Sequence, residues 1–184
     1  MIPVFRPSVG EEEIAAVAVV LRSGWWGLGP KTKEFEDEFA RYIGANHVVG
    51  LNSATAALHL ALNVLGVQGG EVITTPMTFI STNHAILYNN AVPVFADICA
   101  DTLNIDVDDI ERKITPRTKA IMMVHYGGHP CDLDEIHALA RPRGIKVVED
   151  AAHACGAEYK GKRIGSFSDA TCFSFHAVKN LAMG

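Results

Sequence analysis

The stretch "KAIMMVHYGGHPCDLDEIHALARPRGIKVVED", residues 119–150, decides the fold. Its two ends, 119–126 and 145–150, are apolar and rich in β-formers, and the part between them has the pattern of a helix. A strand, a helix and a second strand in this order predict two parallel strands joined by a crossover helix. Because both runs are almost continuously apolar, we expect each strand to be buried on both faces of the sheet.

The same alternation of strands and helices continues on both sides of this unit. It begins at Asn46, and no internal repeat or low-complexity linker interrupts it. Further strands are expected at "HVVGL" (47–51), "EVITTP" (71–76), "VPVFADI" (92–98) and "ATCFSF" (170–175). Further helices are expected at "TAALHLALNVLG" (55–66), "STNHAILYNN" (81–90) and "VDDIERKI" (107–114). The first of these helices is apolar nearly all round, which predicts a buried helix. The pattern as a whole predicts an α/β fold with a mostly parallel sheet.

The first 45 residues have a different, helical character. An apolar stretch from Ile14 to Leu21 follows three glutamates, where a signal peptide would carry positive charge, so we expect an amphipathic helix there. Residues 30–44, "PKTKEFEDEFARYIG", predict a charged surface helix whose buried stripe is Phe35, Phe39 and either Tyr42 or Ile43. We therefore divide the chain into a helical segment, 1–45, and a sheet domain, 46–184.

Composition excludes several classes of function. The chain has 184 residues, 48% of them apolar, and a formal net charge of −5 without a run of Lys and Arg, which argues against a nucleic-acid partner. No stretch approaches the roughly 18 uninterrupted apolar residues of a membrane span. The cysteines at 99, 131, 155 and 172 are scattered without a CxxC pair, which favours neither a disulfide framework nor a metal site. A reducing cytoplasm is the expected location.

Ligands of an open α/β sheet gather beyond the carboxyl ends of the strands, so the residues that follow each strand are the first candidates for a site. Asn52 to Thr55 lie between an expected strand and an expected helix. Free N–H groups of the first helical turn and the hydroxyls of Ser53 and Thr55 could hold a phosphate there. Ser and Thr are also ordinary helix N-caps, and that alternative stays open.

Asp150 ends an apolar strand, where a buried carboxylate needs a partner to offset its desolvation. A protonated pyridine nitrogen would be such a partner, and His153 could reach the same ligand. The alternative is that Asp150 caps a following helix and that His153 is an ordinary core or surface histidine.

Lys179 follows a strand in which Ser174 and His176 alternate with two phenylalanines, so that polar side chains share one face next to it. A lysine in such a cleft loses its proton more easily than in water and can form a Schiff base with an aldehyde. The alternative is a solvated surface lysine. A phosphate anchor, a carboxylate for a pyridinium and an amine for an aldehyde are the fixtures that pyridoxal phosphate (PLP) requires.

The order and approximate spacing of longer stretches, from about Arg6 to the last residue, add a resemblance to this interpretation. The stretches are "RPSVGEEEI", "SGWWGLGPKTKEFEDEFA", "LNSATAALHLAL", "GEVITTPMTF", "ITPRTKAIMMVHYGGHPCDLDEI", "VVEDAAHACGAEYKGKRIGS" and "FSFHAVKN". They resemble the DegT/DnrJ/EryC1/StrS family of PLP-dependent aminotransferases, which install amino groups on nucleotide-linked keto-sugars. The resemblance implies the three-layer α/β/α large domain of the fold-type I, aspartate aminotransferase-like PLP enzymes. Family members continue into a small domain, so the resemblance implies a large domain truncated before it and an active site that is incomplete.

The resemblance also assigns roles to single residues. It implies that Lys179 is the Schiff-base lysine and proton shuttle, that Asp150 pairs with the pyridine nitrogen, and that His153 lies near the phenolic oxygen of the cofactor. Phe79 matches an aromatic residue that stacks on the cofactor ring, although a core residue beside a strand end would fit the same pattern. His176 is typical of the family but receives no role. The implied phosphate contacts are Ala54, through its backbone, Thr55 and Ser174.

The substrate side of the site is also implied by the resemblance. Trp25, Trp26 and Gly27 match a loop near the sugar-nucleotide site, with plain packing at a helix end as the alternative for the tryptophans. The segment 1–45 would thus carry the substrate loop, and 46–184 the cofactor-binding large domain. The implied substrates are an amino donor, glutamate, and a nucleotide-linked keto-sugar of cell-surface polysaccharide, lipid A or antibiotic sugar biosynthesis. The motifs are close to those of the branch that makes UDP-4-amino-4-deoxy-L-arabinose, and the implied assembly is a homodimer.

Two alternatives to the aminotransferase remain. Some members of the family are PLP-dependent sugar dehydratases that have a histidine in place of the Schiff-base lysine, and a lysine at position 179 argues for the aminotransferase. The other alternative is a catalytically incomplete half that only folds or binds.

Overall fold

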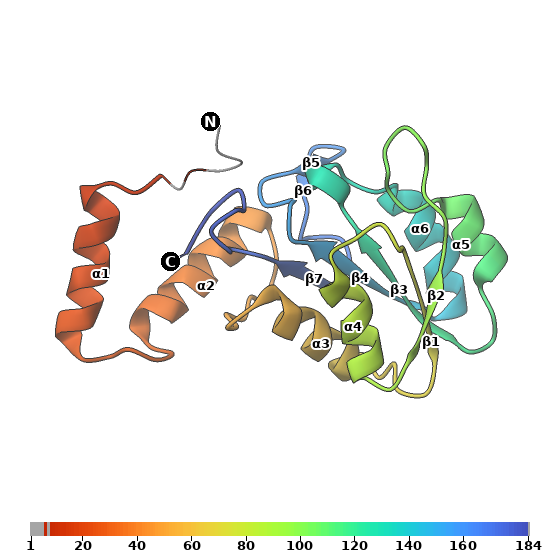
Figure 1. Cartoon of the computed structure of the whole chain (residues 1–184), viewed down its shortest axis with the longest axis horizontal. Coiled ribbons are helices and arrows are strands. Elements are labelled where there is room, and N and C mark those ends of the chain that lie inside the picture. Colours follow the sequence, from red (N-terminus) through yellow and green to blue (C-terminus); the bar gives the residue numbers. More distant parts are fainter. Residues whose placement is uncertain (1–5, 7, 184) are drawn as a thin grey trace.

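The computed structural model describes residue 6 and residues 8–183 (Figure 1). Its α-helices are α1 (Glu11–Ser23), α2 (Pro30–Ile43), α3 (Ala54–Val64), α4 (Ile80–Tyr88), α5 (Val107–Lys113) and α6 (Leu133–Ala140). Its strands are β1 (Glu71–Thr74), β2 (Val92–Phe95), β3 (Thr118–Val124), β4 (Lys146–Ala151), β5 (Glu158–Tyr159), β6 (Lys162–Arg163) and β7 (Ala170–Phe173). Two short 3-10 turns are η1 (Tyr126–Gly128) and η2 (Arg141–Arg143).

The main sheet has five strands in the order β2-β1-β3-β4-β7, and every pair of neighbours is parallel. β3 and β4 lie side by side, joined by α6, as the stretch 119–150 predicts. The small hairpin of β5 and β6 is separate and antiparallel. The predicted parallel α/β fold is confirmed.

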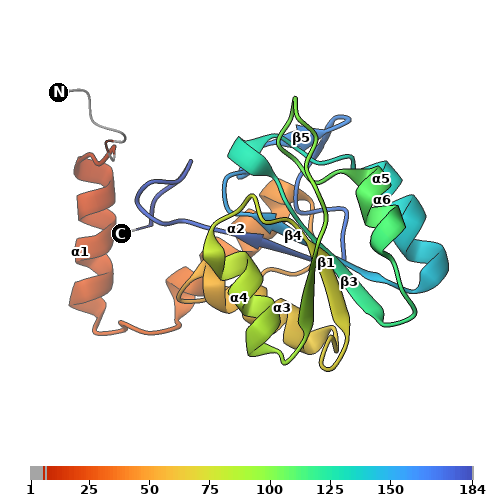
Figure 2. The same cartoon turned by 45° about the vertical axis from the view of Figure 1, so that its right-hand side comes forward.

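Helices cover both faces of this sheet, so the fold has three layers (Figure 2). On one face, Met122 and Val148 belong to a buried cluster with Leu58 and Leu62 of α3 and with residues of α4. On the other face, the neighbouring residues of the same strands belong to a second buried cluster with residues of α5 and α6. Because side chains alternate along a strand, the first cluster marks the even-numbered residues of β3 and β4 as facing α3 and α4. The three-layer α/β/α arrangement predicted from the resemblance is therefore confirmed.

α2 attaches to the sheet through aromatic rings. Phe39 is buried, and its ring meets those of Phe173 and Phe175 edge to face, with centroids 5.1 and 5.4 Å apart. Ile43 is buried as well, whereas Tyr42 is exposed and stacks beneath the Arg163 guanidinium, 3.7 Å from its ring centre. Two members of the predicted stripe, Phe39 and Ile43, are therefore buried, whereas Phe35 is only partly buried, with its ring against those of Phe39 and Phe175.

Three details of the sequence-based prediction are wrong. Residues 47–51 form no strand, because no other segment of the described chain pairs with them. The last strand ends at Phe173 instead of Phe175. α3 is buried on one side only: Leu58 and Leu62 are enclosed, whereas Val64 is 83% exposed, because only one side of the helix meets the sheet.

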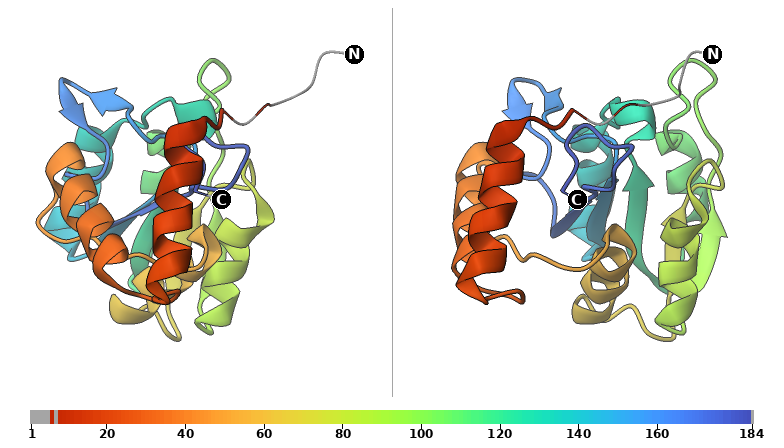
Figure 3. Two further views of the ribbon diagram at one scale, coloured as in Figure 1. Left: turned by 90° about the vertical axis from the view of Figure 1, so that its left-hand side faces the viewer. Right: turned by 60° about the vertical axis from the view of Figure 1, so that its left-hand side comes forward.

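α1 has the predicted helical form but lacks the predicted buried face. Its apolar residues Ile14, Val17 and Leu21 are all more than half exposed, and no residue of this helix is buried within the described part of the chain. The helix lies at the end of the molecule, apart from the sheet (Figures 1 and 3). Among residues 6 and 8–183, no helix is long and apolar enough to cross a membrane.

The central strand β3 should dominate the stability of the sheet. Ile121 of β3 is fully buried, so Ile121→Ala should lower the free energy of unfolding by about 2–5 kcal/mol. The matched control, Val64→Ala, changes a side chain that is 83% exposed and should stay within about 0.5 kcal/mol of the parent. Urea denaturation followed by circular dichroism measures both. Equal losses for the two variants would show that the two-sided core does not carry the stability.

Candidate active site

The carboxyl ends of β4 and β7 bring the candidate residues to one edge and one face of the sheet. Val148 of β4 faces α3 and α4. Because side chains alternate along a strand, Asp150, two residues later, faces the same side. Its register partner in β7 is Cys172, a member of the same buried cluster, and Ser174 comes two residues later. Ser174 is buried, and its hydroxyl accepts a weak hydrogen bond from the N–H of His176 at 3.4 Å.

The Asp150 carboxylate is buried without a cation. It is 4% exposed, and one oxygen accepts a hydrogen bond from the Thr82 hydroxyl at 2.7 Å while the other accepts one from the Ala152 N–H at 3.1 Å. No Lys, Arg or His of the described chain forms an ion pair with it. No helix follows Asp150, so the helix N-cap alternative is wrong. Neutral donors compensate a buried charge only in part, so a cationic group would be a favourable partner at this position.

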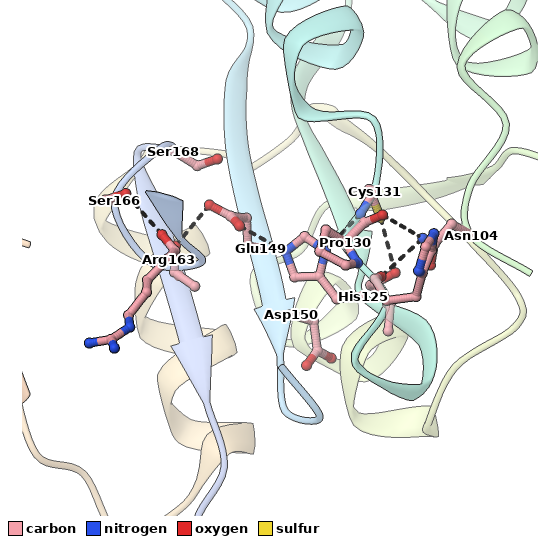
Figure 4. Close-up of polar contacts among 12 residues, drawn as sticks. Asn104, His125, Pro130, Cys131, Glu149, Asp150, Arg163, Ser166 and Ser168 are labelled. Atoms are coloured by element: carbon pink, nitrogen blue, oxygen red, sulfur yellow. Dashed lines mark hydrogen bonds and ion pairs between the residues drawn. The ribbon is translucent and has the colours of Figure 1, made fainter. Parts of the chain in front are cut away.

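Glu149 points to the opposite face and closes a separate polar network (Figure 4). His125 Nε2 lies 2.8 Å from one Glu149 oxygen, and the Thr171 hydroxyl donates to the other at 3.0 Å. The Cys131 N–H donates to His125 Nδ1 at 3.1 Å, so the proton of the neutral ring sits on Nε2 and points at Glu149. Glu149 and His125 are fully buried, and the network ties β3, β4 and β7 together behind Asp150.

Asn104 fixes the turn that follows β3. Its side-chain amide donates to the carbonyls of His129 and Pro130, both at 3.0 Å, and its oxygen accepts from the Tyr126 N–H at 3.0 Å. This turn lies against the segment that follows β4. A Cβ added at Gly128 would stand 2.6 Å from the carbonyl oxygen of His153, so the approach of the two segments requires a glycine there.

The charges of Lys179 and Asp150 both act on His153, and we call these three residues the electrostatic group. Partial desolvation by the surrounding chain lowers the pKa of His153 below its ordinary value of 6.5, the charge of Lys179 lowers it further, and Asp150 opposes both effects. The imidazole is therefore neutral at pH 7. Lys179 is half-buried, and its backbone N–H closes a turn onto the carbonyl of His176 at 2.8 Å.

The start of α3 combines a capped turn with free N–H groups. Ser53 is the N-cap, and its hydroxyl accepts from the Ala56 N–H at 3.1 Å, as the N-cap alternative proposes. The backbone N–H groups of Ala54 and Thr55 precede the first intrahelical hydrogen bond and have no partner in the described chain. Capping by Ser53 and anion binding by these two groups are therefore compatible.

The aromatic candidates are all exposed. Phe79, at the start of α4, is 75% exposed, so the core-residue alternative for it is wrong. Trp25 and Trp26 are 60% and 75% exposed, and their indole N–H groups donate to the carbonyls of Leu28 and Leu21. Gly27 is exposed between them and α2. Within the described residues, no hydrogen bond or ring contact joins this loop to the group around Asp150.

The three-layer fold with its mostly parallel sheet is that of the large domain of the PLP-dependent aminotransferases. The chain matches the DegT/DnrJ/EryC1/StrS aminotransferase family over residues 7–184, and it belongs to this family.

Two curated relatives and one solved protein illustrate the match. The chain is 54% identical over 184 residues to the uncharacterized protein MJ1066 of Methanocaldococcus jannaschii, covering 100% of this chain and 48% of that one. It is 53% identical to the spore coat polysaccharide biosynthesis protein SpsC of Bacillus subtilis, covering 100% and 47%. It is 43% identical to Spr1654 of Streptococcus pneumoniae, a proposed sugar aminotransferase solved in PLP and PMP forms, with TM-scores of 0.94 and 0.95. That match covers 98% of this chain and 50% of Spr1654. The chain spans about half the length of the relatives it matches.

The close approach of the turn after β3 to His153 can be tested with two neighbouring glycines. Gly127 and Gly128 both have positive φ, at 59° and 87°, but only at Gly128 would a Cβ meet another atom. Gly127→Ala should cost about 1–2 kcal/mol for its left-handed backbone. Gly128→Ala should cost at least about 1 kcal/mol more and shift the amide resonances of residues 151–155. Urea denaturation and NMR measure the two effects, and equal costs without such shifts would contradict the contact.

The electrostatic group predicts how His153 titrates. Its NMR titration midpoint should lie below 6.5, Lys179→Met should raise the midpoint by removing a nearby positive charge, and Asp150→Asn should lower it. Lys119→Met is the matched control, because Lys119 lies beside Gly70 at the other end of the sheet and should leave the midpoint unchanged. If Lys179→Met left the midpoint in place, Lys179 and His153 would not share a site.

Proposed function

We propose that this chain supplies the PLP-binding part of an aminotransferase that moves an amino group from glutamate to a nucleotide-linked keto-sugar. One observation carries the proposal: the buried Asp150 carboxylate has neutral donors but no cation, and it lies in one electrostatic group with Lys179. A protonated pyridine ring next to an aldehyde satisfies both residues at once. Membership of the family and the PLP and PMP forms of Spr1654 support the same cofactor.

Each fixture of the cofactor has a residue to hold it. Asp150 keeps the pyridine nitrogen protonated, and the free N–H groups of Ala54 and Thr55, together with the Ser174 hydroxyl, bind the phosphate. Phe79 offers its exposed ring to one face of the cofactor. PLP then supplies an electron sink for the carbon that loses and gains a proton.

Lys179 and His153 handle the protons. In this proposal the Nζ of Lys179 would hold the cofactor and, once the amino donor takes its place, the free amine would act as the base that accepts a proton from the donor carbon. His153 stays uncharged near the phenolic oxygen of the ring, so it does not compete with the pyridinium for the negative charge of Asp150. For the keto-sugar, the Nζ of Lys179 would act in the opposite sense, as the acid that returns a proton to the carbon that gains the amine.

The whole protein of this proposal is a cytoplasmic homodimer. The four cysteines are free, which suits a reducing compartment. Trp25, Trp26 and Gly27 form the substrate loop for the sugar nucleotide, and the tryptophan faces are exposed for such contact. SpsC belongs to spore coat polysaccharide biosynthesis, which supports a cell-surface sugar as the acceptor. A lysine at position 179 disfavours the dehydratase, which has a histidine there.

Borohydride trapping tests this proposal directly. Incubation with PLP should produce an absorbance band, and reduction followed by peptide mass spectrometry should place the label on Lys179 alone, since in this proposal the cofactor is held at the site that Lys179 shares with His153. Lys179→Ala should abolish the label and Lys119→Ala, the matched control, should retain it. Label spread over surface lysines, or none, would contradict the proposal and favour the non-catalytic half.

A further inference from the structure

Thr82 is a buried hydroxyl that neither the sequence nor the proposed function uses. It lies in α4 with none of its surface exposed, and its Oγ1 is 2.7 Å from Asp150 Oδ2. On its other side, the same oxygen is 2.7 Å from the Oγ1 of Thr78, the residue four positions earlier. Thr78, Thr82 and Asp150 thus form a continuous hydrogen-bond chain from the loop before α4 to the carboxyl-terminal part of β4.

The donor and acceptor in each bond of this hydrogen-bond chain follow from the number of hydroxyl protons available. Each threonine hydroxyl has one proton, and that of Thr82 is donated to the Asp150 carboxylate, which accepts on both oxygens. Thr82 can therefore only accept from Thr78, so Thr78 donates to Thr82 and Thr82 donates to Asp150. Hydrogen bonds aligned in one direction polarise one another, which strengthens the last bond, the one to the charged group.

These hydrogen bonds fix the orientation of the Asp150 carboxylate. A carboxylate with two fixed donors has one defined orientation, and its remaining lone pairs are left for a third partner. We propose that Thr82, supported by Thr78, is a positioning residue that holds the Asp150 carboxylate aimed at the ring nitrogen of the cofactor. This inference rests on the proposed function, in which Asp150 binds the ring nitrogen of the cofactor.

The test compares two cofactors that differ in one atom. The dissociation constants of PLP and of its 1-deaza analogue, in which a C–H replaces the ring nitrogen, are measured by titration for the parent chain and for Thr82→Val. Because Thr82 acts through Asp150, Thr82→Val should weaken PLP by about tenfold, the size of one hydrogen bond to a charged group, and should leave the analogue unchanged. Thr82→Ser keeps the hydroxyl and should restore the preference for PLP.

Two controls separate positioning from folding. Thr118→Val removes another buried hydroxyl, near the amino end of β3, and should change neither dissociation constant. In an Asp150→Asn background, Thr82→Val should have no further effect on PLP, because the residue through which it acts is already altered. Equal weakening of PLP and the analogue, or no change in either, would overturn the inference while leaving the proposed function intact. A parent chain that binds neither compound would overturn both.

Discussion

Two successive carboxylates, Glu149 and Asp150, end the strand β4 and point to opposite faces of the sheet, and the rest of the site depends on how each is compensated. Glu149 is satisfied within the chain by His125 and Thr171. Asp150 also has only neutral donors, but it lies on the face of the sheet that carries the candidate residue Ser174. Burying an ionised group without a counter-charge costs several kcal/mol, so a fold that keeps Asp150 in this state stores a preference for a cationic ligand. Glu149 thus has a structural role, whereas Asp150 is the carboxylate that we propose binds the cofactor.

The sequence predicts the sheet well because buried parallel strands carry a strong local signal. The runs 119–126 and 145–150 are apolar enough that only a strand buried on both faces accommodates them. The errors fall where structure depends on a neighbour: 47–51 has strand-forming residues but no adjacent strand among the described residues, and the apolar side of α1 has nothing to cover it there. Local composition reports what a segment prefers, and pairing decides what it forms.

The residues of the site likewise differ in how far the sequence predicts them: those at strand ends are predictable, and those that the fold brings in from elsewhere are not. Asp150 and Lys179 are predictable because each follows a β-rich run, where a sheet exposes ligand-binding residues. Thr82 is 68 positions from Asp150 and lies in a helix, where a threonine carries no signal of its own. The pairing of His125 with Glu149 could have been predicted from the sequence. Each is a polar residue near the end of an apolar strand, and a polar side chain buried there needs a hydrogen-bond partner.

Register is the reason that the two carboxylates keep separate roles. A slip of β4 by one residue would turn Glu149 toward α3 and α4 and Asp150 toward α5 and α6, because side chains alternate along a strand. Val147 and Val148 resist such a slip, since each is buried in the cluster on its own face. The hydrogen bond from the His125 N–H to the Asp150 carbonyl, at 3.1 Å, fixes the same register at the carboxyl edge. The packing of the core and the position of the proposed cofactor-binding carboxylate are therefore set by the same alternation.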